Sequence, residues 1–361
     1  MNDGVLAIGG EEIGLGETRD LELAVAESFT GSPVSIPLRV WRAEQPGPTI
    51  FVTAAVHGDE LNGAGVVREI ILRNPFELKA GSLLLAPVVN VLGFERHSRY
   101  LPDRRDLNRC FPGRAEGSLA SRLAYTVYNE IIMNSDYGID LHTAAVRRTN
   151  FPNVRGDLRS DDVRRLAEAF GCEVIIDGAG PMKTLRRAAC RAKRPTIVLE
   201  AGEVWKMEPH VIEWGVRGIR NALIMLGMVE GERSAPPYQA IVRKTTWLRA
   251  KVGGVLQFHV APGDFVDEDQ AIATNSSLLG REQNVIRSTS EGIVLGMTTL
   301  PAVAPGDPVC HVAIPEEGVA KLRRKIRGES DESLHERTRE TLAAGMHVTE
   351  WEEQGEVESE T

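Results

Sequence analysis

Short apolar runs separated by amphipathic segments constrain the fold of this chain more than any other feature. The runs are rich in β-branched residues and lie at 49–56 (TIFVTAAV), 82–90 (SLLLAPVVN), 138–143 (GIDLHT), 173–177 (EVIID) and 196–202 (TIVLEAG). Strands that are apolar at nearly every position are covered on both faces, which is typical of a mostly parallel sheet between helices. The pattern predicts an α/β fold.

The amphipathic segments between these runs predict helices at 59–73, 118–133 and 160–170. The last of them has a start and an end that can be read from the sequence, because Ser160 can cap its first turn and Gly171 can adopt the left-handed conformation that ends a helix. We therefore expect one large domain in the first part of the chain, with helices on both faces of its sheet.

The second part of the chain differs in composition, because Gly, Pro and Val recur there at short spacing. Segments 253–274 and 290–314 share the order glycine, strand, Pro-Gly-Asp turn and strand. We expect these two hammerheads to close into a small β-sandwich of the barrel-sandwich hybrid type over residues 238–315, after the larger α/β domain at 1–237. Residues 316–361 form a charged extension, and its Glu-rich end is expected to be disordered.

Charge and cysteine content argue against several classes of protein. The chain has 42 Lys and Arg against 51 Asp and Glu, a formal net charge of −9, so a basic face for nucleic acid is not expected. Its four cysteines are far apart and include no Cys-x-x-Cys pair, which favours a reducing cytoplasm over a disulfide framework. No leader and no apolar run long enough to span a bilayer occurs. We expect a cytoplasmic protein without nucleic-acid or membrane partners, and a homo-oligomer is compatible with its size.

Polar residues follow three of the apolar runs, at the points where strands should end: His57, His142 and Glu200. Ligands bind beyond the carboxyl ends of the strands in an open α/β sheet, so these residues can converge. Glu60 comes three residues after His57, a spacing at which both side chains can reach one ion. Two histidines and one carboxylate leave the fourth position of a tetrahedral zinc ion open to water, and zinc lowers the pKa of such a water to about 7. The His-x-x-Glu pair alone also fits an ordinary surface loop.

The stretch SRYLPDRRDLNRCFPG concentrates arginines in one loop. A guanidinium presents a rigid fork that suits a carboxylate or a developing oxyanion, so an arginine-rich loop beside a metal can clamp a substrate. Arg99, Asn108 and Arg109 fit this role. Arg104 and Arg105 fit a solvated charged loop better.

Four motifs together resemble the succinylglutamate desuccinylases and aspartoacylases, relatives of the zinc carboxypeptidases. HGDE, RYLPDRRDLNRCFPG, DLHT and IVLEAGE occur in the order of that family and at roughly its spacing over residues 32–227. The trailing β-module also resembles the C-terminal domain of the family. The resemblance implies a carboxypeptidase-like α/β fold and the hydrolysis of a small N-acyl amino acid to a carboxylate and an amine.

The resemblance also implies roles for individual residues. The zinc ligands that it implies are His57, Glu60 and His142. Glu200 matches the general base of the family, and Arg99 matches the arginine that polarises the scissile carbonyl. Asn108 and Arg109 match its substrate-binding pair.

Some of these roles have competitors. Glu203 lies three positions after the expected base and can compete for that role. The family often has fewer residues between its first arginine and DLNR, so Arg104 and Arg105 compete for the role that polarises the carbonyl. Asp106 and Asp140 are expected to orient loops or histidines, as metal sites commonly require.

Three other functions compete with a zinc amidohydrolase. A carboxypeptidase acting on short peptides can use the same metal and arginines, unless loops or the β-module roof the pocket. The β-module resembles biotinyl and lipoyl carriers, but attachment needs an exposed lysine and none occurs between Lys251 and Lys321. A non-catalytic binding protein is a third alternative, but such a protein does not need a general base beside three metal ligands. The acyl group and the released amine stay open, because arginines indicate a substrate carboxylate without showing which part carries it.

Overall fold

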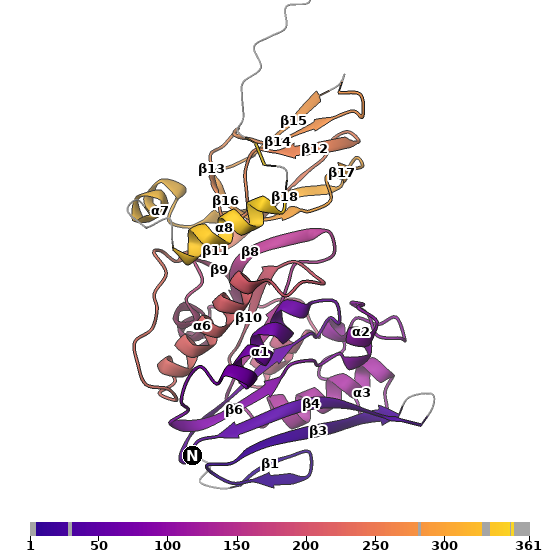
Figure 1. The fold of residues 1–361 in the computed structure, drawn as a ribbon, viewed down its shortest axis with the longest axis vertical. Helices are drawn as coiled ribbons and strands as arrows, with labels where there is room; N and C mark the ends of the chain where they lie inside the picture. The colour runs from indigo at the N-terminus through magenta and orange to yellow at the C-terminus, as the bar shows by residue number, and fades with distance from the viewer. Residues whose placement is uncertain (1–4, 28–30, 281–282, 327–332, 347, 350–361) are drawn as a thin grey trace, which may run out of the picture. The chain divides into compact units, whose positions relative to one another are not determined.

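The chain forms two compact units in the computed structural model (Figure 1). The first comprises Met1–Val146 and Pro152–Arg243, and the second comprises Arg147–Phe151 and Lys244–Thr361. The second unit thus includes a short segment from the middle of the chain, which the sequence did not indicate. The structure describes residues 5–27, 31–280, 283–326, 333–346 and 348–349.

The main sheet of the first unit has the strand order β11-β9-β8-β10-β7-β5-β6-β4-β3. Parallel pairs join β11 to β9, β9 to β8, β10 to β7, and β5 to both β7 and β6. At one edge, β6, β4 and β3 pair antiparallel. The strand bounds are β3 Thr18–Glu27, β4 Pro33–Arg42, β5 Gln45–Ala54, β6 Ala80–Ala86, β7 Tyr137–His142, β8 Arg148–Gly156, β9 Val174–Asp177, β10 Thr196–Gly202 and β11 Ala240–Arg249.

The α/β fold and the five expected strands are confirmed by β5, β6, β7, β9 and β10. A mixed, mostly parallel sheet was expected, but β3 and β4, the strands of the antiparallel edge, were not predicted individually. Strand β4 buries every second residue, so it has the alternating pattern of a half-exposed strand and lacks the continuous apolar run of a central one. A separate hairpin, β1 Leu6–Ile8 with β2 Glu11–Ile13, precedes the sheet.

Helices cover both faces of this sheet. On one face α1 and α4 both contact α6, and α1 also contacts β5 and β7 (Figure 1). On the other, buried residues of α3, η2 and α5 join a core cluster with β3 to β6. The bounds are α1 Leu61–Arg73, α2 Val91–Glu95, η1 Leu107–Arg109, α3 Leu119–Thr126, η2 Val127–Ile132, α4 Asp161–Phe170, α5 Leu185–Arg191 and α6 Pro209–Met225.

The three expected helices are confirmed, with two local differences. Helix α4 follows Ser160 and ends at Gly171, whose φ of +90° is the left-handed conformation expected there, although the Ser160 side chain makes no capping hydrogen bond. The segment expected as one helix over 118–133 widens into a π-helical turn, η2, after Thr126.

The second unit contains two sheets. One has the order β13-β16-β18-β11, and β16 also pairs antiparallel with Arg148–Asn150 of β8. The other has the order β15-β14-β12-β17, and buried residues of both sheets form one apolar cluster. The bounds are β12 Gly254–Phe258, β13 Phe265–Val266, β14 Ala271–Ser276, β15 Gln283–Arg287, β16 Gly292–Thr298, β17 Ala302–Val303 and β18 Pro308–Pro315.

The repeated Pro-Gly-Asp turns of this unit have the same local structure. Gly263 and Gly306 have φ values of +98° and +90°. In each turn the following aspartate accepts a hydrogen bond at 2.8 Å from a backbone N–H three residues earlier, Asp264 from Ala261 and Asp307 from Ala304. The repeat seen in the sequence is therefore also a repeat of backbone geometry.

The charged extension includes two helices that the sequence did not indicate, α7 Val319–Ile326 and α8 Leu334–Ala344. Helix α8 buries Leu334, Thr338 and Leu342, which recur every fourth residue and form one stripe on a charged helix. The expected disordered end falls at residues 350–361, outside the described residues. Within the described part of the chain, no helix combines the length and the apolar character needed to cross a membrane.

Candidate metal centre

Three side chains meet at the carboxyl ends of β5 and β7. His57 lies in the turn after β5, Glu60 occupies the N-cap position of α1, and His142 is the last residue of β7. The turn needs a glycine at position 58, because a Cβ there would lie 2.0 Å from the backbone carbon of Gly93. This close approach brings the His57 turn against α2.

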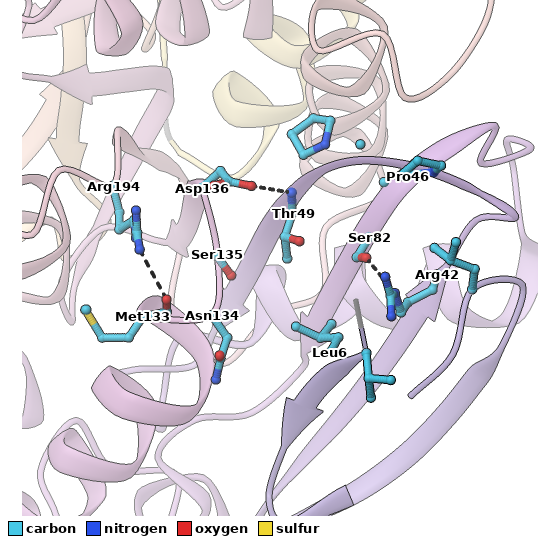
Figure 2. A pocket seen from close by; sticks show the side chains of 15 residues that line it. Leu6, Arg42, Pro46, Thr49, Ser82, Met133, Asn134, Ser135, Asp136 and Arg194 are labelled. Carbon is cyan, nitrogen blue, oxygen red and sulfur yellow. Dashed lines mark hydrogen bonds between the residues drawn. The ribbon is translucent and has the colours of Figure 1, made fainter. Parts of the chain in front are cut away.

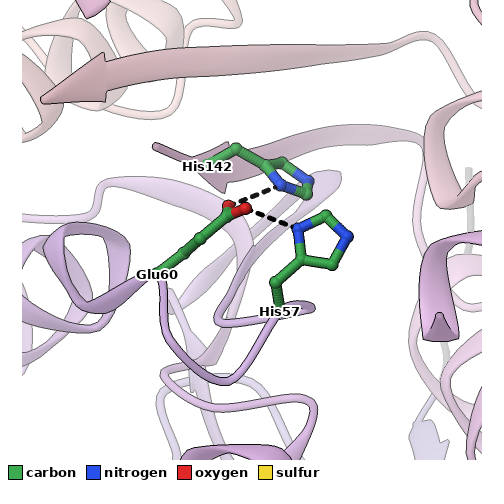
Figure 3. Close-up of side chains that lie close together, drawn as sticks. All are labelled: His57, Glu60 and His142. Atoms are coloured by element: carbon green, nitrogen blue, oxygen red, sulfur yellow. Dashed lines mark hydrogen bonds and ion pairs between the residues drawn. The ribbon is translucent and has the colours of Figure 1, made fainter. Parts of the chain in front are cut away.

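Glu60 lies between the two imidazoles and contacts both (Figure 3). Its Oε1 is 2.6 Å from Nδ1 of His57, and its Oε2 is 2.9 Å from Nδ1 of His142. All three side chains are buried, and one ligand atom from each lies within 4.8 Å of the others. Among the described residues they are the only such group of His, Cys, Asp and Glu, so they form a site that can hold a metal ion.

Further hydrogen bonds orient the two rings. Nε2 of His142 lies 2.8 Å from Asp140, whose other oxygen accepts a 2.8 Å hydrogen bond from the Thr53 hydroxyl. Nε2 of His57 lies 3.2 Å from Asp106. Each ring can therefore donate Nε2–H to a carboxylate while its Nδ1 faces Glu60 at the centre of the group, where a metal would take it as a ligand.

Mutual attraction outweighs the cost of burying these charges. Burial alone would lower the pKa of His142, but the carboxylates of Asp140 and Glu60 hold it well above its usual 6.5. Burial likewise opposes protonation of His57, whose pKa is raised because Glu60 and Asp106 outweigh that effect. Burial alone would raise the pKa of Glu60, but the two imidazoles hold it below its usual range. Without a metal, the two imidazoles therefore tend to hold protons, and a bound cation would displace these protons.

Arg99 is the arginine of the loop that reaches this group. Its Nη1 lies 3.4 Å from Oε1 of Glu60, and its Nη2 donates a 3.0 Å hydrogen bond to Asp106. Burial opposes the charge of Arg99, but Asp106 and Glu60 outweigh it and raise its pKa. Arg104 is exposed, and Arg105 bonds Asp103.

The hydrogen bonds of Asn108 and Arg109 lead away from the three metal-site residues. Oδ1 of Asn108 accepts a 2.8 Å hydrogen bond from the backbone N–H of Leu185, at the start of α5. Arg109 is exposed, and its Nη1 donates to the backbone oxygen of Asn108 at 2.8 Å. The structure therefore shows Asn108 as an anchor of α5 and Arg109 as an exposed side chain bonded to the backbone of its neighbour.

Glu200 is paired in register with His142 across the parallel strands β10 and β7. Its side chain is 18% exposed, and Oε1 lies 3.5 Å from Nη1 of Arg155. Glu203, its competitor, lies beyond the strand and forms a 2.5 Å ion pair with Lys206. Register alone thus brings Glu200, and not Glu203, alongside a residue of the metal site.

Arg186 is a buried cation in this region that the sequence analysis missed. It lies in α5, is 9% exposed, and its Nη1 has no hydrogen-bond partner among the described residues. Burial lowers its pKa, and the charges that act on it include Glu200 and Asp140. A Cβ on residue 180, which is glycine, would lie 2.5 Å from Nη2, so this glycine leaves room for the guanidinium.

A sequence signal for Arg186 existed but was weak. Helix α5 buries Leu185, Arg186, Ala188 and Ala189. An arginine next to the small apolar residues of the buried face is unusual and suggests a functional cation. It went unnoticed because several other arginines follow within a few residues.

Comparison with known proteins identifies the family of this chain. The sequence model described as "Succinylglutamate desuccinylase/Aspartoacylase catalytic domain" matches residues 46–226, half of this chain. A curated relative, the N-alpha-acetyl-L-2,4-diaminobutyric acid deacetylase of Halomonas elongata, is 28% identical over an alignment of 313 residues that covers 81% of this chain and 89% of that protein.

Solved structures share the fold. A succinylglutamate desuccinylase from a Silicibacter species has a TM-score of 0.72 at 20% identity, covering 83% of this chain and 95% of that chain. The product-bound ectoine utilization protein EutE (DoeB) of Ruegeria pomeroyi has a TM-score of 0.72 at 21% identity, covering 82% and 95%. The similarity extends well beyond the span of the family match, and this chain belongs to the succinylglutamate desuccinylase/aspartoacylase family.

Proposed function

We propose that this protein is a zinc-dependent hydrolase that cleaves the amide bond of a small N-acyl amino acid or a related N-acylated amine. The observation that carries the proposal is the convergence of His57, Glu60 and His142, with Arg99 in contact with the group and Glu200 in register beside it. Family membership supports the same reaction, because the family is one of deacylases.

The three side chains fit one zinc ion per chain. Two imidazole nitrogens and one carboxylate are the ligands of a catalytic rather than a structural zinc site. Both rings have their other nitrogen beside a carboxylate, which fixes the nitrogen that faces the ion. When bound, such an ion polarises a carbonyl and makes water a nucleophile near neutral pH.

The protein's own groups supply the remaining chemistry. Glu200 accepts the proton of the attacking water at a carboxylate oxygen and returns it to the nitrogen of the departing amine. Its ion pair with Arg155 restricts the rotation of the carboxylate. Arg99 donates N–H groups toward the oxygen on which negative charge develops, and its bond to Asp106 holds the guanidinium in place. No covalent acyl-enzyme is required.

The cations of the site favour a substrate that carries a carboxylate. Arg186 has a buried N–H group that no described residue satisfies, and burying such a donor is costly unless a ligand satisfies it. Arg109, with its exposed fork, and Asn108 are the proposed contacts at the entrance. The Halomonas relative acts on an acetylated diamino acid according to its name. We therefore place N-acetylated diamino acids first among the candidates, with other acyl groups still open.

The proposal also includes the domain organisation, the location and the assembly of the protein. The catalytic domain over 1–237 is taken as carboxypeptidase-like, and residues 238–315 as a β-sandwich of the hammerhead type. The enzyme is expected to act in the cytoplasm, alone or as a homo-oligomer.

A substrate screen tests the proposal. Zinc-loaded protein is incubated with N-acetyl and N-succinyl derivatives of aspartate, glutamate, ornithine and 2,4-diaminobutyrate, and the products are measured by liquid chromatography with mass spectrometry. Chelated protein and a Glu60→Gln variant serve as controls, and both should be inactive. Faster release of C-terminal residues from short peptides would instead identify a carboxypeptidase. Stoichiometric zinc without turnover of any compound would identify a binding protein.

A further inference from the structure

A cavity of about 620 Å³ lies at the amino-terminal ends of β5, β6 and β7, where these strands begin (Figure 2). The metal centre lies where β5 and β7 end, so the two sites are at opposite ends of the same strands. The volume is within the range typical of pockets that bind small molecules. The proposed deacylation does not use this cavity.

Two local irregularities form its walls. Gln45 of β5 pairs with Ala80 and Thr49 pairs with Ser82, so residues 46–48 bulge opposite Gly81 alone. Pro46 and Pro48 have no N–H to donate, which prevents regular pairing there. On the facing side, the π-helical turn η2 leads directly into the wall at Met133–Asp136. Bulges and π-turns both recur beside functional sites.

Two guanidinium groups stand on opposite sides of the cavity (Figure 2). Arg42 is 6% exposed and is held by bonds from Nη1 to the backbone oxygen of Ile13 at 2.5 Å and from Nε to the Ser82 hydroxyl at 3.3 Å. Arg194 donates from Nη2 to the backbone oxygen of Met133 at 3.3 Å. Its Nε is buried and has no partner among the described residues. Arg194 therefore lines the cavity with a guanidinium whose donors the described residues do not all satisfy.

The charged groups of the wall favour a ligand with a single negative charge. Besides the two arginines, the ionisable group of the lining is Asp136, and one of its carboxylate oxygens accepts the backbone N–H of Thr49 at 2.9 Å. Two positive charges and one negative charge leave the cavity with one net positive charge, which suits a monoanion better than a dianion.

The rest of the wall is largely apolar. Leu6, Leu15 and Met133 line it together with the two prolines of the bulge. Leu15 is 41% exposed and Met133 is 40% exposed, so both present apolar surface that a ligand can cover. An apolar lining with a few converging polar groups is the usual composition of a small-molecule site.

We propose that this cavity binds a small carboxylate with a short apolar tail, whose carboxylate pairs with the guanidinium of Arg194 while its tail lies against Leu6, Leu15 and Met133. Arg42 contributes charge from the opposite wall, and its bonds to Ile13 and Ser82 keep it in place. The site is independent of the metal centre, because none of its residues belongs to the proposed catalytic machinery.

Methyl-detected NMR on the full chain, with hexanoate as the probe, tests this site. Signals of Leu6, Leu15 and Met133 should shift and saturate at about millimolar hexanoate. Hexanol has the tail without the charge, and inorganic phosphate has charge without the tail, so both should bind about 10-fold or more weakly. Arg194→Gln should weaken hexanoate binding by about 10-fold, whereas Arg73→Gln, an exposed arginine on α1, should not.

A second pair of variants tests the position of the anion. Leu15→Glu places a negative charge at the wall and should weaken hexanoate binding by about 10-fold, while the neutral Leu15→Gln should retain most of it. Leu15 is exposed enough to tolerate either change, and circular dichroism checks the fold. The proposal fails if hexanoate leaves the three methyl signals unchanged, if hexanol or phosphate binds as tightly, or if Arg194→Gln binds like the wild type.

Discussion

Glu200 and His142 lie opposite each other in the register of two neighbouring parallel strands, β10 and β7. Residues paired in this way point to the same face of a sheet, so the proposed base and a proposed metal ligand are neighbours by backbone geometry alone. The relationship does not depend on any particular rotamer of either side chain. It is the structural basis for assigning the base to Glu200.

Glu200→Gln keeps the size of the side chain but cannot accept a proton. Turnover of an identified substrate should fall roughly 100-fold to 10,000-fold, the usual range for the loss of general acid–base catalysis. Zinc content should stay near that of the wild type, because Glu200 is not a proposed ligand. Glu203→Gln is the matched control and should remain active. If the control is inactive and Glu200→Gln turns over normally, the base is Glu203.

His142→Ala should lose the metal. Zinc measured by inductively coupled plasma mass spectrometry should fall from about one ion per chain to a small fraction of that, because two ligands cannot complete a catalytic site. His210→Ala is the control, since His210 is also buried but lies in α6 away from the three converging residues. Equal zinc in wild type and His142→Ala would remove His142 from the site.

Metal affinity should rise with pH. Neighbouring carboxylates raise the pKa of His57 and His142 above 6.5, so the metal-free protein keeps protons that a metal must displace. The stabilisation from these protons is present below pH 6.5 and is lost as pH rises through the raised pKa values. Each displaced proton weakens apparent affinity about 10-fold per pH unit below its pKa. Competition with a chromophoric chelator between about pH 6 and pH 8 measures the slope, and a flat profile would contradict the assigned protonation.

Arg109→Lys keeps the charge but loses the planar fork. If Arg109 holds a substrate carboxylate by two parallel hydrogen bonds, kcat/KM should fall about 10-fold. Arg104→Lys, in the same loop and also exposed, should leave it unchanged. Equal efficiency of Arg109→Lys and wild type would argue against the clamp.

Arg186→Met removes the buried cation and keeps a long apolar side chain. For a substrate with a carboxylate, KM should rise about 10-fold to 100-fold, as expected when a charged hydrogen bond is lost. An analogue in which that carboxylate is replaced by a primary amide should show little change. Arg191→Met, at the exposed end of the same helix, is the control. A rise in KM of the same size for both substrates would assign Arg186 a purely structural role.

Much of the first unit was predictable because its central strands are buried on both faces. Continuous apolar runs such as 49–56 and 196–202 distinguish such strands from other structure, and β5 and β10 follow them closely. Strands β3 and β4, at the antiparallel side of the sheet, have alternating apolar and polar residues, and such a pattern is harder to tell from a loop in the sequence. Helices α7 and α8 lie in sequence that looks like a charged tail, because only a narrow stripe of each is buried.

The convergence of His57, Glu60 and His142 was predictable from the sequence, and so was the approach of Arg99, whereas Arg186 was not. Strand ends and the His-x-x-Glu spacing pointed to the three residues, but the other family motifs were needed to set them apart from an ordinary surface loop. The position of Arg186 depends on which face of a short helix is buried, and that depends on tertiary packing. The domain boundaries expected at residues 237 and 315 remain predictions.

Residues Arg147–Phe151 belong to the second unit but lie within the sequence of the first, so no single truncation point separates the two units. Thr149 and Asn150 pair with Met297 and Gly296 of β16, yet almost a hundred residues of the first unit lie between this segment and the rest of the second. A protein truncated after residue 243 would keep the segment and lose its pairing partners. Its backbone N–H and C=O groups would then form an open strand edge, which favours self-association. The chain is therefore expected to evolve, express and fold as a whole, and not as two exchangeable modules.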